Sequence, residues 1–195
     1  MPNPEGWTYY NNIRTCQQED FISVFPPFLL TENFTDILEI GTNRGGLTLL
    51  LKHTLPACNI VTYDVMSAEE LGLDIVIDAG VTFKQKNIFD SQYNVVDQEF
   101  LDLIKNSGKL LILVDGGNKP AEFNGIAPHL RVGDFIMCHD YISDSTTFET
   151  TFLNKIWNFH EISEAHIENA CNQYNLQSVY PEFNNIVWQC KKKIS

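Results

Sequence analysis

The sequence is poor in basic residues. It carries 13 Lys+Arg against 25 Asp+Glu, a formal net charge of -12 at pH 7, and three of its cations, Lys191, Lys192 and Lys193, crowd into the last five residues. A protein that binds nucleic acid non-specifically needs a basic surface to neutralise phosphates. The composition therefore argues against a nucleic-acid partner.

Long apolar runs are also missing. The densest run, LLILV at 110–114, is far below the roughly 20 residues that a membrane helix needs, and the opening residues MPNPEGWTYYNN are neither basic nor apolar. We therefore expect a cytoplasmic protein without a membrane partner. Five widely spaced cysteines, never in a CxxC pair, predict neither a disulfide framework nor a zinc knuckle.

The remaining sequence has the pattern of one α/β domain. No internal repeat or Pro/Gly/Ser-rich linker divides the 195 residues, and 44% of them are hydrophobic, which suffices for one core. Short apolar runs alternate with helix-length segments. Strands are expected at 36–40, 59–64, 81–87, 109–115 and 134–140, and helices at 46–55, 95–105, 120–130, 145–157 and 164–174.

Two β-rich runs at the end, 176–183 and 184–192, are joined so briefly that they are expected to pair antiparallel. The whole pattern predicts a doubly wound, Rossmann-like fold with a mostly parallel seven-stranded sheet and a terminal antiparallel hairpin. Residues 1–34, whose apolar stretch is broken by Pro26-Pro27, are expected to form a helical cap ahead of the domain at 35–195.

In such a sheet, ligands bind outside the carboxyl ends of the strands. A glycine-rich loop, EIGTNRGG at 39–46, lies between a predicted strand and helix. Its glycines let backbone N–H groups approach a ligand, and the helix N-terminus favours an anionic group. Asp64 closes the next strand, 23 residues after Gly41, where an acid can accept hydrogen bonds from both hydroxyls of a ribose. Together they indicate an adenosine-containing ligand.

The pattern ExGxxxGG at 39–46 resembles the first motif of the class I S-adenosylmethionine-dependent methyltransferases. Asp64 resembles the acid with which they bind the ribose. Asn87-Ile88-Phe89-Asp90 resembles their segment that holds adenine. The terminal hairpin is similar to theirs as well, so the resemblance covers about residues 35–190. It implies S-adenosylmethionine, or S-adenosylhomocysteine, as the cofactor. The residues that it assigns to cofactor binding are Glu39, Gly41, Thr42, Asn43, Gly45, Asp64, Asn87, Ile88 and Asp115.

Within that superfamily, residues 115–141 resemble a stretch shared by cephalosporin-hydroxylase-like and macrolide O-methyltransferases. Those typically read DG.H, then a helix, then GG or GD, then a strand closing with an acidic pair. Asp115-Gly116 and Asp140 match this pattern, whereas Asn118 stands where a histidine is frequent and His139 replaces the first acid of the pair. The resemblance implies methylation of an oxygen atom on a small-molecule acceptor.

Asp115, His139 and Asp140 are the predicted catalytic residues. Asp115 and Asp140 could share a divalent cation, Mg²⁺ or Mn²⁺, that orients a substrate hydroxyl and lowers its pKa; the alternative is that both pair with Lys119 or with backbone amides. His139 is predicted as a general base, a ligand or a core histidine. Strand alternation points it away from Asp140 unless a local turn brings both inward. Lys119 itself is expected to be an exposed lysine at a helix start, and the alternative is that it holds an anionic substrate.

Several alternatives stay open. Glu39 could merely cap the next helix, and Asn87 could merely close a turn. The competing functions are a nicotinamide-dependent oxidoreductase, which Asn43 disfavours because the dinucleotide fingerprint GxGxxG has glycine there, and a non-catalytic nucleotide-binding protein on the same fold. A homo-oligomer is possible. The other histidines, expected to be structural, are His53, His129, His160 and His166.

Overall fold

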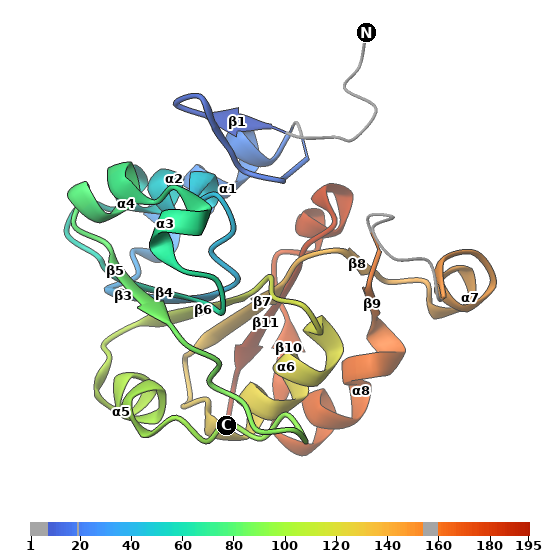
Figure 1. The fold of residues 1–195 in the computed structure, drawn as a ribbon. Helices are drawn as coiled ribbons and strands as arrows, with labels where there is room; N and C mark the ends of the chain where they lie inside the picture. The colour runs from blue at the N-terminus through green and yellow to red at the C-terminus, as the bar shows by residue number, and fades with distance from the viewer. Residues whose placement is uncertain (1–7, 19, 154–159) are drawn as a thin grey trace, which may run out of the picture.

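The computed structural model describes residues 8–18, 20–153 and 160–195. Its centre is a seven-stranded sheet in the order β10-β11-β7-β6-β3-β4-β5 (Figure 1). The strands are β3 (Asp36–Ile40), β4 (Asn59–Asp64), β5 (Thr82–Gln85), β6 (Leu110–Val114), β7 (Phe135–Cys138), β10 (Leu176–Ser178) and β11 (Gln189–Lys193). Strands β3 to β7 pair in parallel, and β11 pairs antiparallel with both β7 and β10. This confirms the predicted fold class.

Helices cover both faces of the sheet (Figure 1). One face carries α1 (Phe21–Glu32), α2 (Gly46–Thr54), α3 (Ala68–Leu71) and α4 (Asp74–Asp78), and the other carries α5 (Gln98–Asn106), α6 (Lys119–Ile126) and α8 (Glu164–Gln173). The side chains of β6 alternate between the two apolar clusters, and all five are fully buried. Burial on both faces explains the uninterrupted aliphatic run of this strand.

The amino-terminal segment differs from the prediction in two ways. Strands β1 (Tyr9–Tyr10) and β2 (Ile13–Arg14) form a hairpin whose two-residue turn places both Asn11 and Asn12 at positive φ, as a type I′ turn requires. Helix α1 continues through Pro26-Pro27, although each proline removes a helical hydrogen bond. Burial of its apolar face, above all Phe21, Phe25 and Leu29, against the sheet offsets that loss.

The carboxyl-terminal third also needs corrections. The helix predicted at 145–157 is α7 (Ser145–Thr147) followed by a π-helical segment, η2 (Phe148–Phe152), and 154–157 lies outside the described residues. Strand β8 (Tyr141–Ile142) pairs in parallel with β9 (Ile162–Ser163). Residues 127–129 of the helix predicted at 120–130 form a 3₁₀ turn, η1 (Ala127–His129).

The terminal hairpin is antiparallel as predicted, but its connection is longer. A 3₁₀ helix, η3 (Pro181–Ile186), lies between β10 and β11. Tyr180 and Val187 flank it with φ of 55° each, and these two left-handed residues cap the 3₁₀ helix at its start and its end. No helix within the described residues is long and apolar enough to cross a membrane.

The register of the parallel strands determines where the candidate site lies. Ile40, the last residue of β3, pairs with Tyr63 of β4 and Val114 of β6, and Val114 pairs in turn with Cys138 of β7. The residues that follow these positions therefore meet at one edge of the sheet. They are Gly41, Asp64, Asp115 and His139.

Candidate active site

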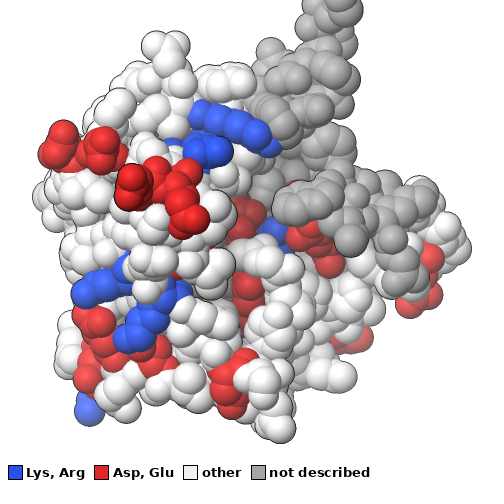
Figure 2. Space-filling model, viewed as in Figure 1, with Lys and Arg blue, Asp and Glu red and all other residues white. Residues whose placement is uncertain are grey.

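A cleft of about 870 Å³ opens at the carboxyl edge of the parallel strands. Acidic and basic side chains meet in the hollow near the middle of this face (Figure 2). Of the residues predicted from the sequence, the cleft is lined by Gly41, Thr42, Asn43, Asp64, Asn87, Ile88, Asp115, His139 and Asp140. Glu39 and Gly45 are not among the described residues that line it.

Gly41 brings the ends of β3 and β6 into close approach. Its φ is +92°, and a Cβ added there would lie 2.6 Å from the carbonyl carbon of Asp115. Asn43 also has a left-handed backbone, with φ of 48°, a conformation that asparagine tolerates better than most residues. Asparagine can therefore occupy this position of the loop without the conformational freedom of glycine.

Asp64 anchors this loop from the neighbouring strand. Its Oδ2 accepts a hydrogen bond from the backbone N–H of Asn43 at 3.0 Å, and its Oδ1 accepts one from the backbone N–H of Met66 at 3.0 Å. An ionised carboxylate has about four acceptor sites. Each oxygen therefore retains capacity for a hydroxyl donor in the cleft.

Glu39 lies beneath the loop, fully buried, rather than in the cleft. Its Oε2 accepts hydrogen bonds from the hydroxyls of Thr48, at 2.6 Å, and Thr62, at 2.5 Å. The Thr62 hydroxyl in turn contacts that of Thr42 at 2.6 Å. Burial raises the pKa of Glu39 to about 8, although the two threonine hydrogen bonds lower it. In this position Glu39 ties β3 to α2 and β4 and reaches the cleft only through Thr62 and Thr42.

Gly45 is likewise placed by packing. It is the N-cap directly before α2, with φ of +75°, and an added Cβ would lie 2.6 Å from Cγ2 of Val76 in α4. On the opposite side of the cleft, the side-chain oxygen of Asn87 accepts the backbone N–H of Phe89 at 3.0 Å. This closes a local turn, the alternative that the sequence left open for Asn87. Ile88, which lies between Asn87 and Phe89 in the chain, is buried and lines the cleft.

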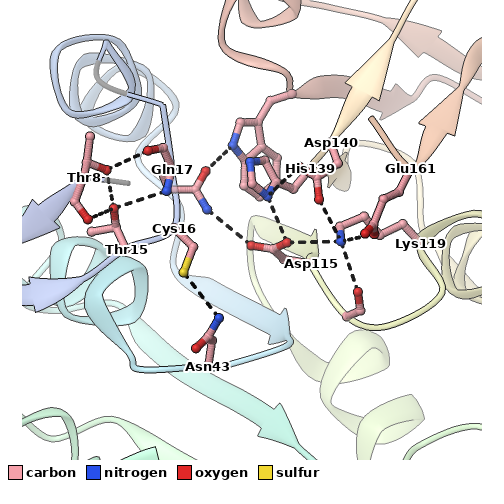
Figure 3. A network of polar contacts seen from close by, with 12 residues as sticks. Thr8, Thr15, Cys16, Gln17, Asn43, Asp115, Lys119, His139, Asp140 and Glu161 are labelled. Carbon is pink, nitrogen blue, oxygen red and sulfur yellow. Dashed lines mark hydrogen bonds and ion pairs between the residues drawn. The ribbon is translucent and has the colours of Figure 1, made fainter. Parts of the chain in front are cut away.

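Lys119 is the centre of a polar cluster at the ends of β6 and β7, which we call the lysine–acid cluster: Lys119, Asp115, Asp140 and Glu161 (Figure 3). The side chain of Lys119 is only 5% exposed, so the prediction of an exposed lysine is wrong. Its Nζ lies 2.7 Å from Glu161 Oε2, 3.0 Å from Asp140 Oδ2 and 3.6 Å from Asp115 Oδ1. A buried ammonium group is stabilised by opposite charges at such distances.

His139 and Asp140 face the same side because both follow the last residue of β7, Cys138. Asp140 has φ of 57°, a left-handed backbone that interrupts strand alternation and provides the local turn considered above. Nδ1 of His139 lies 3.0 Å from Asp115 Oδ1 and 3.6 Å from Asp140 Oδ1. Since a carboxylate only accepts hydrogen bonds, His139 donates from Nδ1 to Asp115.

Two further residues support this pair and carry no signal in the sequence. Gln17 donates from Nε2 to Asp115 Oδ2 at 3.3 Å and accepts at Oε1 from the indole N–H of Trp188 at 2.7 Å (Figure 3). The Trp188 ring stacks on His139 with centroids 4.9 Å apart. Gln17 lies 98 positions from Asp115, so only the folded chain brings them together.

The electrostatics favour an ion pair. Burial alone would raise the pKa of Asp115, but the charge and hydrogen bond of His139, together with Lys119, lower it below its ordinary value. Burial alone would lower the pKa of His139, but Asp115 and Asp140 raise it above its ordinary value. Asp115 is therefore ionised at neutral pH and favours the protonated form of His139.

Replacing Asp115 by asparagine is expected to lower the pKa of His139, because the largest attractive charge on the imidazole is lost. The titration of the His139 ring protons, followed by NMR between pH 5 and 9, measures this change. Asp64→Asn, which removes another carboxylate from the same cleft, is the matched control and should leave the His139 titration unchanged. Equal effects of the two variants would contradict the pairing.

No protein-family profile matches the chain, and no curated protein sequence matches it either. Solved structures, in contrast, match the chain. The chain is similar to CmcI in its apo form, with a TM-score of 0.68 and 12% identity over 96% of this chain and 76% of CmcI. It is also similar to a caffeoyl-CoA O-methyltransferase-like protein of Staphylococcus aureus, with a TM-score of 0.60 and 12% identity over 88% and 82% of the two chains.

The fold is that of the class I S-adenosylmethionine-dependent methyltransferases. A third structure, human N-acetylserotonin methyltransferase in complex with SAM, matches this methyltransferase fold with a TM-score of 0.55 and 12% identity over 89% of this chain and 52% of that one. Identities this low establish the fold alone. The chemistry of the present chain must be argued from its own cleft.

The residues at the ends of β3 and β4 fit the cofactor of the methyltransferase fold. The backbone of Gly41 lines the cleft without a side chain, and Asp64 beside it retains acceptor capacity. A carboxylate with two available lone pairs suits the vicinal hydroxyls of a ribose.

The lysine–acid cluster does not fit a divalent cation. Asp115, His139 and Asp140 each offer one possible ligand atom, all within 4.8 Å of one another. However, the ammonium of Lys119 already lies 3.0 Å from Asp140 and 3.6 Å from Asp115. A Mg²⁺ or Mn²⁺ ion about 2.0–2.2 Å from these oxygens would be pressed against that ammonium. The structure therefore has the alternative arrangement, in which both aspartates pair with Lys119.

Proposed function

We propose that this chain is an S-adenosylmethionine-dependent methyltransferase that methylates an oxygen atom of a small-molecule acceptor. One observation carries the proposal. The glycine loop after β3 and the Asp64 carboxylate border the same cleft as the Asp115–His139 pair. A cofactor-binding edge and a proton-accepting group thus share one cavity.

In this proposal the loop at Gly41, Thr42 and Asn43 binds the methionine part, Asp64 binds the ribose hydroxyls, and Asn87 and Ile88 border the adenine. When bound, S-adenosylmethionine supplies a methyl group made reactive by its sulfonium. The protein then has two tasks: to align the acceptor oxygen and to remove its proton.

His139 is the proposed base. Asp115 accepts the hydrogen at Nδ1, which leaves Nε2 as the basic nitrogen of the neutral ring. Asp115 thereby fixes the tautomer and favours the imidazolium that forms when the acceptor loses its proton. The pKa of His139 is raised. The neutral imidazole is therefore populated only at pH values above the ordinary pKa of histidine. The rate of methyl transfer is therefore expected to increase with pH there.

Isothermal titration with S-adenosylmethionine, S-adenosylhomocysteine and NAD tests the proposal. We expect both sulfur compounds to bind and NAD not to. Tighter binding of NAD would favour the oxidoreductase. Binding of S-adenosylmethionine without turnover across a panel of phenols and aliphatic alcohols would favour a non-catalytic protein.

Replacing Asp64 by alanine is expected to weaken binding of S-adenosylmethionine by roughly ten- to a hundredfold, because two charge-assisted hydrogen bonds to the ribose are lost. Calorimetry measures the change, and a 2′-deoxy analogue identifies its cause. The parent should discriminate against the analogue and the variant should not. Asp144→Ala is the control, since Asp144 also accepts backbone N–H groups, from Thr146 and Thr147, but is not among the described residues that line the cleft. A parent protein that binds both ligands equally would refute the ribose role.

A further inference from the structure

The ammonium of Lys119 is held on several sides. It donates to Glu161 Oε2 at 2.7 Å and to the carbonyl oxygen of Gly116 at 3.1 Å, and it forms an ion pair with Asp140 Oδ2 at 3.0 Å. Two of the three N–H donors of the lysine are therefore used in hydrogen bonds to the protein. Asp115 lies slightly farther away, at 3.6 Å, and interacts mainly through its charge. The ammonium of Lys119 is therefore surrounded by acids of the protein itself, and its role is to hold them.

Local structure fixes this position. Lys119 is the first residue of α6, and the preceding Asn118 caps the helix by accepting the backbone N–H of Ala121 at 3.3 Å. Glu122, one turn on, accepts the backbone N–H of Asn118 at 3.1 Å. Pro120 limits the backbone further. The lysine thus extends back from a rigid helix start into the cleft and is not a mobile surface side chain.

The partners of Lys119 are those that a hard divalent cation would select: carboxylate and carbonyl oxygens that converge from separate segments. Asp115 follows β6, Asp140 follows β7, and Glu161 immediately precedes β9. Without a cation between them, three carboxylates so close together would repel one another strongly. A single buried ammonium offsets part of that repulsion and fixes their orientation (Figure 3).

We propose that the ammonium group of Lys119 takes the place of a divalent cation between Asp115, Asp140 and Glu161, so that this site binds no metal ion and Lys119 acts as its positioning residue. What the positioned acids accomplish rests on the proposed function, but occupancy by lysine does not. Under that function, removal of the acceptor proton falls to His139 and its aspartate, and a chelator leaves turnover unchanged.

Binding of Mn²⁺, measured by water-proton relaxation with the protein alone, tests the proposal. The wild-type protein should bind no Mn²⁺ at about millimolar concentration. Lys119→Met keeps the length of the side chain and removes the ammonium, which releases three carboxylates for a metal ion. We expect this variant to bind Mn²⁺ with an affinity about tenfold or more above the upper limit that the titration sets for the wild type.

Lys191→Met is the matched control. Lys191 is another buried lysine, paired with Glu164 at 2.6 Å and Ser178 at 2.8 Å, and it does not line the cleft. Its loss should create no Mn²⁺ site. If Lys119→Met cannot be purified folded, Lys119→Gln, which keeps hydrogen-bond donors without the charge, takes its place.

Three results would overturn the proposal: Mn²⁺ binding by the wild type, no gain in a folded Lys119 variant, or an equal gain in Lys191→Met. A parallel titration with S-adenosylmethionine keeps the two hypotheses separate. Failure to bind that cofactor would count against the proposed function, whereas the Mn²⁺ result would still decide whether lysine occupies the cation position.

Discussion

Replacing Gly41 by alanine is expected to lower the free energy of unfolding by about 3 kcal/mol or more, and the larger Gly41→Val to abolish binding of S-adenosylmethionine. A positive φ costs a residue with a Cβ about 1–2 kcal/mol, and forced overlap in a packed site adds about 1–3 kcal/mol. The overlap is with backbone, 2.6 Å from the carbonyl carbon of Asp115. No side chain can rotate to relieve it, so β3 and β6 must move apart and distort the loop.

Urea unfolding and calorimetry measure the two effects. Gly117→Ala is the matched control, because Gly117 lines the same cleft and an added Cβ there meets no described atom within 4 Å. Its stability and affinity should stay close to those of the parent. A Gly41→Ala protein as stable as the parent, with unchanged affinity, would show that the close approach of the two strands is not required.

The second large effect concerns the dependence of stability on pH. The pKa of Glu39 is about 8 in the folded protein, against an ordinary value of 4.5, because the carboxyl group is buried. The folded state therefore holds a proton that the unfolded state has lost. The stability that this proton contributes is fully present below pH 4.5 and is lost as pH rises through about 8, at about 1.4 kcal/mol per pH unit. The total is on the order of 5 kcal/mol.

Glu39→Gln imitates the protonated acid and cannot ionise. We expect it to match the parent near pH 4 and to be more stable than the parent by a few kcal/mol near pH 9. Urea unfolding at pH 4, 6, 8 and 9 gives both curves, and the low-pH point serves as the internal control. If the free energy of unfolding depended on pH in the same way for both proteins, Glu39 would not be protonated in the folded state.

Much of the fold could be predicted because the spacing of apolar residues along the chain indicates which faces of a strand or helix are buried. LLILV at β6 is apolar without interruption since both of its faces are covered, and the alternation of strands and helices implies a parallel sheet with its ligand edge at the strand ends. That edge brings Gly41, Asp64, Asp115 and His139 together from separate parts of the chain. Residue type and position at the end of a strand were enough to identify them.

The sequence alone therefore determined the α/β class, the ligand edge and the polar residues at the strand ends, since apolar periodicity and glycine placement act over a few residues. Only the tertiary structure decided what the polar groups do. The sequence predicts an exposed Lys119 at the start of a helix. In the structure Lys119 is buried, because Asp140 and Glu161 converge on it from other segments. Gln17 reaches Asp115 across 98 positions. Such partners are chosen by long-range packing, which makes a buried charge favourable only when its counter-charges arrive with it.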